Sequence, residues 1–113
     1  MKKYCLALDL QDNPELINEY IDLHKSIWPE IEDSIRVSGI LNMEIYCVQN
    51  RLFMIIEAND DFSFENKKRL DEENEKVQEW EDLMSTFQKP LPRSKSDEKW
   101  LIMNRIFELN KKS

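Results

Sequence analysis

The order of apolar and polar positions along the chain predicts four β-strands. Residues 3–10 and 41–48 alternate between two faces, which is the two-residue period of a strand. Residues 52–58 and 100–109 are apolar on both sides, and residues 3–10 largely so. A strand that is apolar on both faces is typical of the middle of a sheet, so we expect residues 3–10 and 52–58 to lie in its interior.

A first helical stretch lies between the first two of these strands. Asn13 and Pro14 mark its start, because Asn caps helices and Pro fits their first position. Apolar residues then recur at steps of three and four residues up to Gly39, where the stretch ends. Pro29 removes a backbone donor and disfavours helical geometry at Trp28, so we expect the helix to kink or restart at this pair.

A second helical stretch spans about residues 64–88, which contain neither Gly nor Pro and carry a narrow apolar stripe. Residues 89–97 are a loop by composition. The β-α-β-β-α-β order predicts an α+β fold of the ferredoxin-like kind, a four-stranded antiparallel sheet with both helices on one face. We expect residues 1–113 to form one domain. The other face of the sheet is apolar and needs a cover, so we expect a homodimer with the two sheets face to face.

The charge balance and the glycine content limit the partners. The chain has 16 basic and 23 acidic residues, a net charge of −7, which disfavours binding to nucleic acid and to anionic membranes. No stretch approaches the roughly 20 apolar residues of a membrane span. Asp9 interrupts the first apolar run too early for an export signal, so we expect a cytoplasmic protein. Gly39 alone cannot supply the glycine-rich loops that bind nucleotide cofactors.

The two cysteines give no framework for a disulfide or a metal. Cys5 and Cys47 are 42 positions apart, with no C-x-x-C pair and no cluster of His and Cys, so a zinc site is disfavoured. We expect both to be buried free thiols. Nucleophilic catalysis by either is disfavoured as well, since each falls within a predicted strand and would need His24 close by.

The single histidine of the chain stands in an aromatic setting. Tyr20, His24 and Trp28 are spaced at i, i+4 and i+8, so in a helix all three side chains line one face. That spacing has two interpretations: a site that holds a ring-shaped ligand, or a structural histidine packed in the core. If it is a site, general acid–base chemistry suits it, because imidazole with a pKa near ~6.5 both gives and takes a proton around neutrality.

Further motifs run along nearly the whole chain. They begin with Tyr20-x3-His24-x2-Ile27-Trp28-Pro29-Glu30 and continue with Gly39-x2-Asn42, Ile45-Tyr46, Leu52-Phe53 with Glu57, Trp80-x3-Met84 and Ile106-Phe107-x-Leu109. Together they resemble the L-rhamnose mutarotase family, and the H-x2-I-W-P-E core is fairly specific. The resemblance implies a cofactor-free dimeric α/β barrel that interconverts the α and β anomers of a 6-deoxyhexose pyranose.

The resemblance also implies roles at the matching positions. His24 corresponds to the proton donor of the family, Tyr20 to a tyrosine that contacts the sugar, and Trp80 to the first of two paired tryptophans. Met43 and Glu81 stand where the family has a tyrosine and the second tryptophan. These are ligand-contact positions, so the preferred monosaccharide, L-rhamnose, L-fucose or another deoxyhexose, stays open.

The expected mechanism is that His24 protonates the ring oxygen while Tyr20 or a bound water handles the hydroxyl proton. Trp28 and Trp80 would stack on the apolar C–H face of the sugar. Glu81 either accepts a hydrogen bond from a sugar hydroxyl or faces solvent. Two other functions stay open: a non-catalytic sugar-binding or regulatory module on the same barrel, and a cofactor-free oxygenase, for which the chain offers no second histidine.

Overall fold

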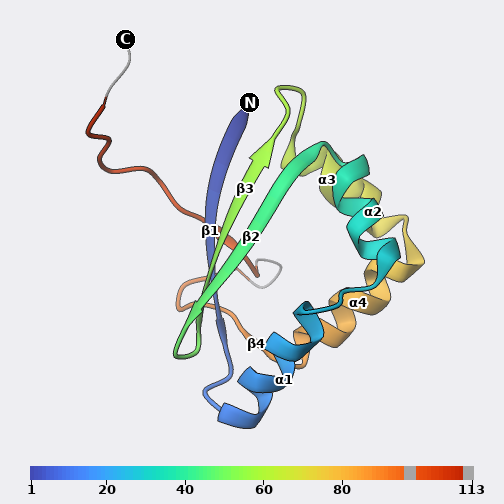
Figure 1. The fold of residues 1–113 in the computed structure, drawn as a ribbon, viewed down its shortest axis with the longest axis vertical. Helices are drawn as coiled ribbons and strands as arrows, with labels where there is room; N and C mark the ends of the chain where they lie inside the picture. Colours follow the sequence, from blue (N-terminus) through green and yellow to red (C-terminus); the bar gives the residue numbers. More distant parts are fainter. Residues whose placement is uncertain (96–98, 111–113) are drawn as a thin grey trace.

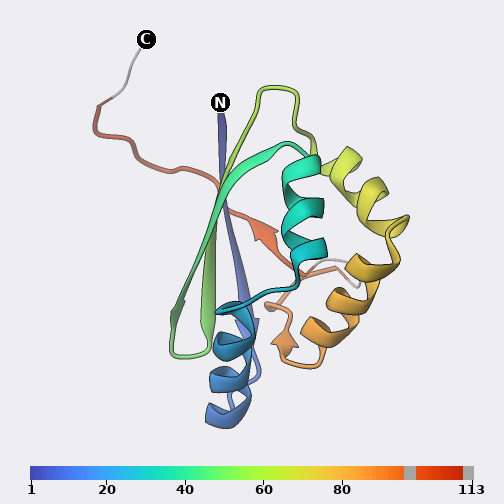
Figure 2. The ribbon, with the colours of Figure 1, turned by 45° about the vertical axis from the view of Figure 1, so that its right-hand side comes forward.

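The chain folds into an antiparallel sheet with helices packed on one of its faces (Figure 1). The computed structural model describes residues 1–95 and 99–110. The strands in this part are β1 (Lys2–Leu10), β2 (Ile40–Val48), β3 (Arg51–Ala58), β4 (Gln88–Lys89) and β5 (Leu101–Ile102). The helices are α1 (Pro14–His24), α2 (Pro29–Val37), α3 (Phe64–Glu72) and α4 (Glu75–Ser85). Figure 2 shows the sheet edge-on, with its helix-free face open.

The strand order confirms the ferredoxin-like fold. The sheet runs β2-β3-β1-β4, and β5 also pairs with β1. β1 and β3 lie in the interior, as their two-sided apolar pattern predicted, and they are paired along almost their full length. β4 pairs with Asp9 and Leu10, while β5 pairs with Leu6 and Ala7. The fourth strand that we expected is therefore reduced to β5, and β4, at the expected end of the second helical stretch, is an additional short strand along the same edge of β1.

The prediction of a strand over residues 100–109 was wrong for most of that range. The pairing covers only Leu101–Ile102, followed by one hydrogen bond from the Met103 amide to the Cys5 carbonyl at 2.7 Å. Beyond it the chain runs away from the sheet (Figure 1), and Ile106 and Phe107 are 97% and 72% exposed. A strand that is apolar on both sides needs a cover on both sides, and one copy of the chain supplies helices on one side only.

Both helical stretches are broken. The first breaks where predicted: α1 begins after the Asn13 cap, ends at His24, and Pro29 opens α2. The second was predicted as one helix over residues 64–88 and is divided into α3 and α4. Asn74 causes the division, because its side-chain Oδ1 accepts hydrogen bonds from the Lys76 and Val77 amides at 3.1 and 3.2 Å. An Asn side chain that binds the backbone in this way competes with helix continuation.

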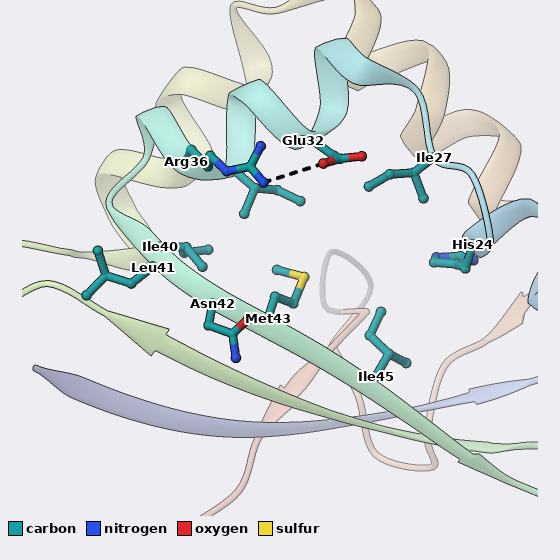
Figure 3. A pocket seen from close by; sticks show the side chains of 10 residues that line it. His24, Ile27, Glu32, Arg36, Ile40, Leu41, Asn42, Met43 and Ile45 are labelled. Atoms are coloured by element: carbon teal, nitrogen blue, oxygen red, sulfur yellow. Dashed lines mark ion pairs between the residues drawn. The ribbon is translucent and has the colours of Figure 1, made fainter.

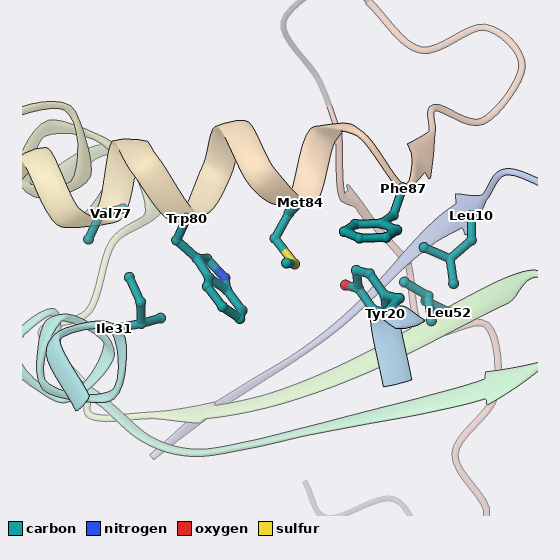
Figure 4. Close-up of a cluster of buried hydrophobic side chains, with 8 residues drawn as sticks. All are labelled: Leu10, Tyr20, Ile31, Leu52, Val77, Trp80, Met84 and Phe87. Atoms are coloured by element: carbon teal, nitrogen blue, oxygen red, sulfur yellow. The ribbon is translucent and has the colours of Figure 1, made fainter. Parts of the chain in front are cut away.

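The core consists of two clusters between the helices and the sheet. The larger joins α4 and α1 to the central strands (Figure 4), with Leu10, Tyr20, Ile31, Leu52, Val77, Trp80, Met84 and Phe87. The smaller contains Leu6, Ile40, Met54, Ile56, Ala58 and Phe62. Burial of large side chains of this kind stabilises the fold by about 1.5–3 kcal/mol each.

The cysteines are free, as expected, but they are not both buried. Cys5 is half-buried, whereas Cys47 is exposed near the end of β2. β2 is an edge strand of the sheet, so a side chain near its end lacks neighbours on one side. In the described part of the chain, no helix is long and apolar enough to cross a membrane.

Candidate functional site

The helices and the sheet enclose two cavities that meet at His24. One has a volume of about 350 Å³ and the other about 690 Å³, which is the usual size range of small-molecule sites. His24 and Met43 line both of them. We refer to them as the smaller and the larger cavity. The site is therefore organised around the end of α1 and the inner face of β2.

The smaller cavity opens between α2 and β2 (Figure 3). The β2 side chains Met43 and Ile45 form its floor, and His24 lies at the α1 end. On α2, Glu32 and Arg36 form an ion pair of 3.5 Å along the rim. This cavity thus combines an apolar floor with a charged edge.

Tyr20 and His24 form a stacked pair one turn apart on α1. Their ring centroids are 4.3 Å apart with an interplanar angle of 32°. The His24 Nδ1 lies 2.8 Å from the backbone carbonyl oxygen of Tyr20. A carbonyl oxygen only accepts hydrogen bonds, so Nδ1 carries a proton and donates it. In the neutral imidazole the Nε2 then holds the lone pair.

Burial sets the protonation of both rings. It lowers the pKa of His24 below its usual value, and the backbone hydrogen bond to Tyr20 opposes this only in part. Burial raises the pKa of Tyr20 to about 12, against a hydrogen bond from the Gln88 side chain that lowers it. At neutral pH the site therefore holds a neutral imidazole, which can take a proton, next to a protonated phenol, which can donate a hydrogen bond.

The tryptophans take different positions. Trp80 on α4 lines the larger cavity and lies edge-on to His24, with ring centroids 5.6 Å apart. Trp28 caps α2 and packs against Trp80 at 5.1 Å, and it lines neither cavity. Because α1 ends at His24, Trp28 does not continue the helix face of Tyr20 and His24. Trp28 therefore packs against Trp80, which lines the larger cavity, without lining either cavity itself.

Glu81 follows Trp80 on α4 and also lines the larger cavity. Its side chain is 43% exposed, with the Oε2 at 3.4 Å from the Lys99 Nζ. Lys99 also donates a hydrogen bond to the Ser85 hydroxyl. Where the family pattern has a second indole, this wall thus carries an ion pair.

Sequence reasoning missed several residues of the larger cavity. Gln88, Lys99 and Trp100 line it, as do Lys67 and Asp71, an ion pair of 2.6 Å whose side chains are about one-fifth exposed. Gln88 had been placed at the end of a helix, and it is instead the first residue of β4. No motif marks these positions. The pairing of β4 and β5 with β1 brings Gln88, Lys99 and Trp100 to the cavity, whereas Lys67 and Asp71 reach it from α3. Among the described residues, no group of three or more His, Cys, Asp and Glu side chains could hold a metal ion.

Comparison with known proteins assigns this arrangement to a family. The family model described as L-rhamnose mutarotase matches residues 3–109. The chain is 38% identical over 112 residues to an L-fucose mutarotase of Xanthomonas campestris, covering 97% of this chain and 90% of that protein.

Solved structures share the fold. The L-rhamnose mutarotase FA22100 of Formosa agariphila superposes with a TM-score of 0.71 at 18% identity, over 97% of this chain and 100% of that one. A dimeric ferredoxin-like protein from an uncultured marine organism gives a TM-score of 0.52 at 15% identity, over 76% of each chain. Both likenesses confirm the fold.

Proposed function

Because the chain belongs to the L-rhamnose mutarotase family, we propose that it is a mutarotase, an isomerase that interconverts the α and β anomers of a 6-deoxyhexose pyranose, L-rhamnose or L-fucose. The observation that carries the proposal is the stacked pair of Tyr20 and His24 beside the two cavities. The pair supplies a base and a hydrogen-bond donor within one sugar-sized space, which is what the exchange of anomers requires.

In the first step His24 acts as a base. Its Nδ1 proton is held by the Tyr20 carbonyl and its pKa is lowered, so the free Nε2 takes the proton of the anomeric hydroxyl. The electron pair of that O–H bond forms the aldehyde C=O as the bond between C1 and the ring oxygen breaks. The Tyr20 phenol, or a water beside it, gives a proton to the departing ring oxygen. This order differs from the expected one, in which His24 donates first.

The second half of the reaction reverses these transfers on the other face. The aldehyde turns about the C1–C2 bond, and the former ring oxygen attacks C1 while its proton returns to Tyr20 or the water. The imidazolium of His24 gives its proton to the carbonyl oxygen, which becomes the new anomeric hydroxyl. No net proton is consumed. General acid–base assistance of this kind accelerates a reaction by typically about 10²–10⁴-fold.

The walls of the cavities suit a sugar with one apolar side. Trp80 offers an aromatic face and Met43 a flexible apolar side chain on the opposite wall, and both line the larger cavity with His24. Aromatic rings pack well on the C–H face of a pyranose and on a methyl group. In the proposal Trp28 acts indirectly, through its contact with Trp80 at 5.1 Å. Glu81 is a candidate acceptor for a sugar hydroxyl.

Saturation-transfer NMR tests the function directly. We expect the protein to accelerate the exchange of α and β anomers of L-rhamnose or L-fucose, and His24→Ala to return the rate to the uncatalysed value. Lys25→Ala, the exposed neighbour, should keep full activity. Exchange at the uncatalysed rate with both sugars would reject the proposal, and sugar binding without exchange would identify a non-catalytic sugar-binding module. Full activity of His24→Ala would exclude His24 as the base.

We further propose that the protein is a homodimer with the sheets face to face, acting in the cytoplasm. The outer face of the sheet carries the half-buried Phe53 and Ile55 beside the exposed Tyr46 and Val48. Surfaces of this kind on a soluble protein are typical of interfaces. The exposed Cys47 thiol, which is unpaired, fits a reducing compartment.

A further inference from the structure

The side of α3 that faces the larger cavity is charged, whereas a helix packed on a sheet usually turns apolar side chains inwards. Five residues at the helical spacing i, i+3, i+4, i+7 and i+8 line the cavity from this helix: Phe64, Lys67, Lys68, Asp71 and Glu72. Only the first of them is apolar. Neither the mechanism above nor the family resemblance uses any of the five. A few polar groups in the wall of a largely apolar cavity are what orients a small ligand.

Lys67 and Asp71 form the half-buried centre of this charged side. The Lys67 Nζ lies 2.6 Å from the Asp71 Oδ2, and the two side chains are 20% and 19% exposed. An ion pair that has lost much of its hydration adds little to stability. A second pair on the same helix, Arg69 and Glu73, has the same spacing but is 61% and 66% exposed and lines neither cavity. The contrast within one helix favours a role for the first pair in the cavity.

The pair lies towards the end of the larger cavity that is away from Tyr20. Phe64, the first residue of α3, packs on Tyr4 near the start of β1, with ring centroids 4.8 Å apart. Tyr20 packs on Phe87 at 6.0 Å, and β4, which follows Phe87, pairs with the end of β1. Figure 2 accordingly shows α1 and α3 at opposite ends of the helical layer. A sugar bound at Tyr20 therefore has its far side towards α3.

The helix α4 joins the charged pair to the reaction centre. The Gln78 side chain donates a hydrogen bond of 2.8 Å to the backbone carbonyl of Asp71. Two residues further along α4, the Trp80 ring lies 5.6 Å from that of His24. Groups held on packed helices keep their geometry better than groups on loops. The pair and His24 therefore form two fixed ends of one binding space.

The chemistry of the sugar identifies the group that meets the pair. In the proposed reaction Tyr20 and His24 bind the ring oxygen and the anomeric hydroxyl on C1. In a pyranose, C3 lies across the ring from the ring oxygen and C4 lies across from C1, so the far side carries the 3- and 4-hydroxyls. A carboxylate only accepts hydrogen bonds and an ammonium only donates them, whereas a hydroxyl does both. One hydroxyl can therefore bind both members of the pair.

We propose that Lys67 and Asp71 are specificity-determining residues: the 4-hydroxyl of the sugar donates a hydrogen bond to the Asp71 carboxylate and accepts one from the Lys67 ammonium. This inference rests on the proposed mutarotase function and adds a requirement to it, a hydroxyl opposite the anomeric carbon. L-Rhamnose and L-fucose differ in configuration at C2 and C4, so the pair takes part in the choice between them.

The test compares two sugars with matched variants. Saturation-transfer NMR gives kcat/KM for the faster of L-rhamnose and L-fucose and for its 4-deoxy analogue, each corrected for the uncatalysed exchange. We expect the wild type to prefer the hydroxylated sugar by at least about tenfold, because hydrogen bonds to charged groups are strong. The double variant Lys67→Met and Asp71→Leu removes both charges together and should treat the two sugars equally within about twofold.

A milder variant and a control complete the test. Asp71→Asn keeps the size of the side chain and an acceptor oxygen but loses the charge, so its preference should lie between those of the wild type and the double variant. The control makes the same two substitutions in the exposed pair of α3, Arg69→Met and Glu73→Leu, and should keep the wild-type preference.

The outcomes separate the inference from the function on which it rests. If the wild type accelerates neither sugar, the mutarotase function fails. If the wild type is active but turns over both sugars equally, the 4-hydroxyl is not recognised and the inference is wrong. A preference that persists unchanged in the Lys67 and Asp71 variants, or that the Arg69 and Glu73 control loses as well, would also overturn it.

Discussion

At the scale of single residues, the site depends on a competition between two effects on His24. Removal from water disfavours the imidazolium, whereas the bond from Nδ1 to the Tyr20 carbonyl and the position at the end of α1 favour it. The lowered pKa shows that burial is the larger effect. The same bond leaves only Nε2 for the substrate, so the histidine has one functional nitrogen in a fixed tautomer.

This balance predicts the pH dependence of the reaction. The base form of His24 is required, and its pKa lies below the usual 6.5, so activity should stay high below pH ~6.5 and fall only as the pH passes the lowered value. The measurement is kcat/KM against pH by saturation-transfer NMR, with the buffer-catalysed rate subtracted at each pH. An acid limb centred at or above pH ~6.5 would mean that the titrating base is not the buried His24.

Tyr20→Phe tests the phenol separately from the ring. The ring packs at 6.0 Å from Phe87 and 4.3 Å from His24, and Phe keeps both contacts. We expect kcat to fall by about 10²-fold because the hydroxyl is lost. The free energy of unfolding should fall by only about 1 kcal/mol, since one polar group is lost while the packing of the ring is kept. Urea unfolding measures the second quantity, and a large loss of stability with unchanged kcat would contradict the assignment.

The matched control for this variant is Tyr4→Phe. The Tyr4 ring packs against Phe62 and Phe64 and lines neither cavity. Phe keeps both ring contacts. Both kcat and the urea midpoint should therefore stay close to those of the wild type.

At the scale of secondary-structure elements, one of the two helix breaks could be predicted from the sequence and the other could not. Pro29 predicts the first break, because its ring disfavours a continuous helix at this position whatever the rest of the fold is. Asn74 gives a weaker signal, since Asn is tolerated inside helices as well as at their caps. Whether an Asn caps or continues a helix depends on where the next helix packs, here on the anchoring of α4 by Val77 and Trp80.

Asn74→Ala should therefore lower the free energy of unfolding by about 1 kcal/mol, the usual value of an N-cap. Its Oδ1 accepts hydrogen bonds from the Lys76 and Val77 amides, and these donors would lose their partner. Thermal or urea unfolding measures the loss. Asn18→Ala, at an exposed position inside α1, is the control and should be neutral or slightly stabilising, because Ala is the better helix former.

The candidate site was also predictable only in part: local contacts followed from the sequence and long-range contacts did not. Tyr20 and His24 are four residues apart on one helix, so their contact follows from local periodicity. Gln88 and Lys99 reach the cavity only because β4 and β5 pair with β1, contacts between residues far apart in the chain. Trp28 shows the limit of periodicity: its spacing fits the helix face, but the helix ends before it.

At the scale of the whole molecule, two apolar features lie outside the core of the protomer. One is the open face of the sheet (Figure 2). The other is the segment after β5, where Ile106, Phe107 and Leu109 are 97%, 72% and 80% exposed. Exposure of several large side chains in one short segment is costly in water. A second copy of the chain could bury both the open sheet face and the segment after β5. We therefore expect both to lie in one dimer interface.

The oligomeric state provides the last prediction. Light scattering after size exclusion should give twice the protomer mass of 13.7 kDa. The double variant Ile106→Asp and Phe107→Asp should shift the protein towards the monomer as the concentration is lowered, because buried charges without partners oppose association. Val37→Asp is the control, since Val37 is 75% exposed but lies on α2, on the helical side of the sheet. A wild-type monomer at every concentration would contradict the dimer, whereas a double variant that stays dimeric would show that the interface is the sheet alone.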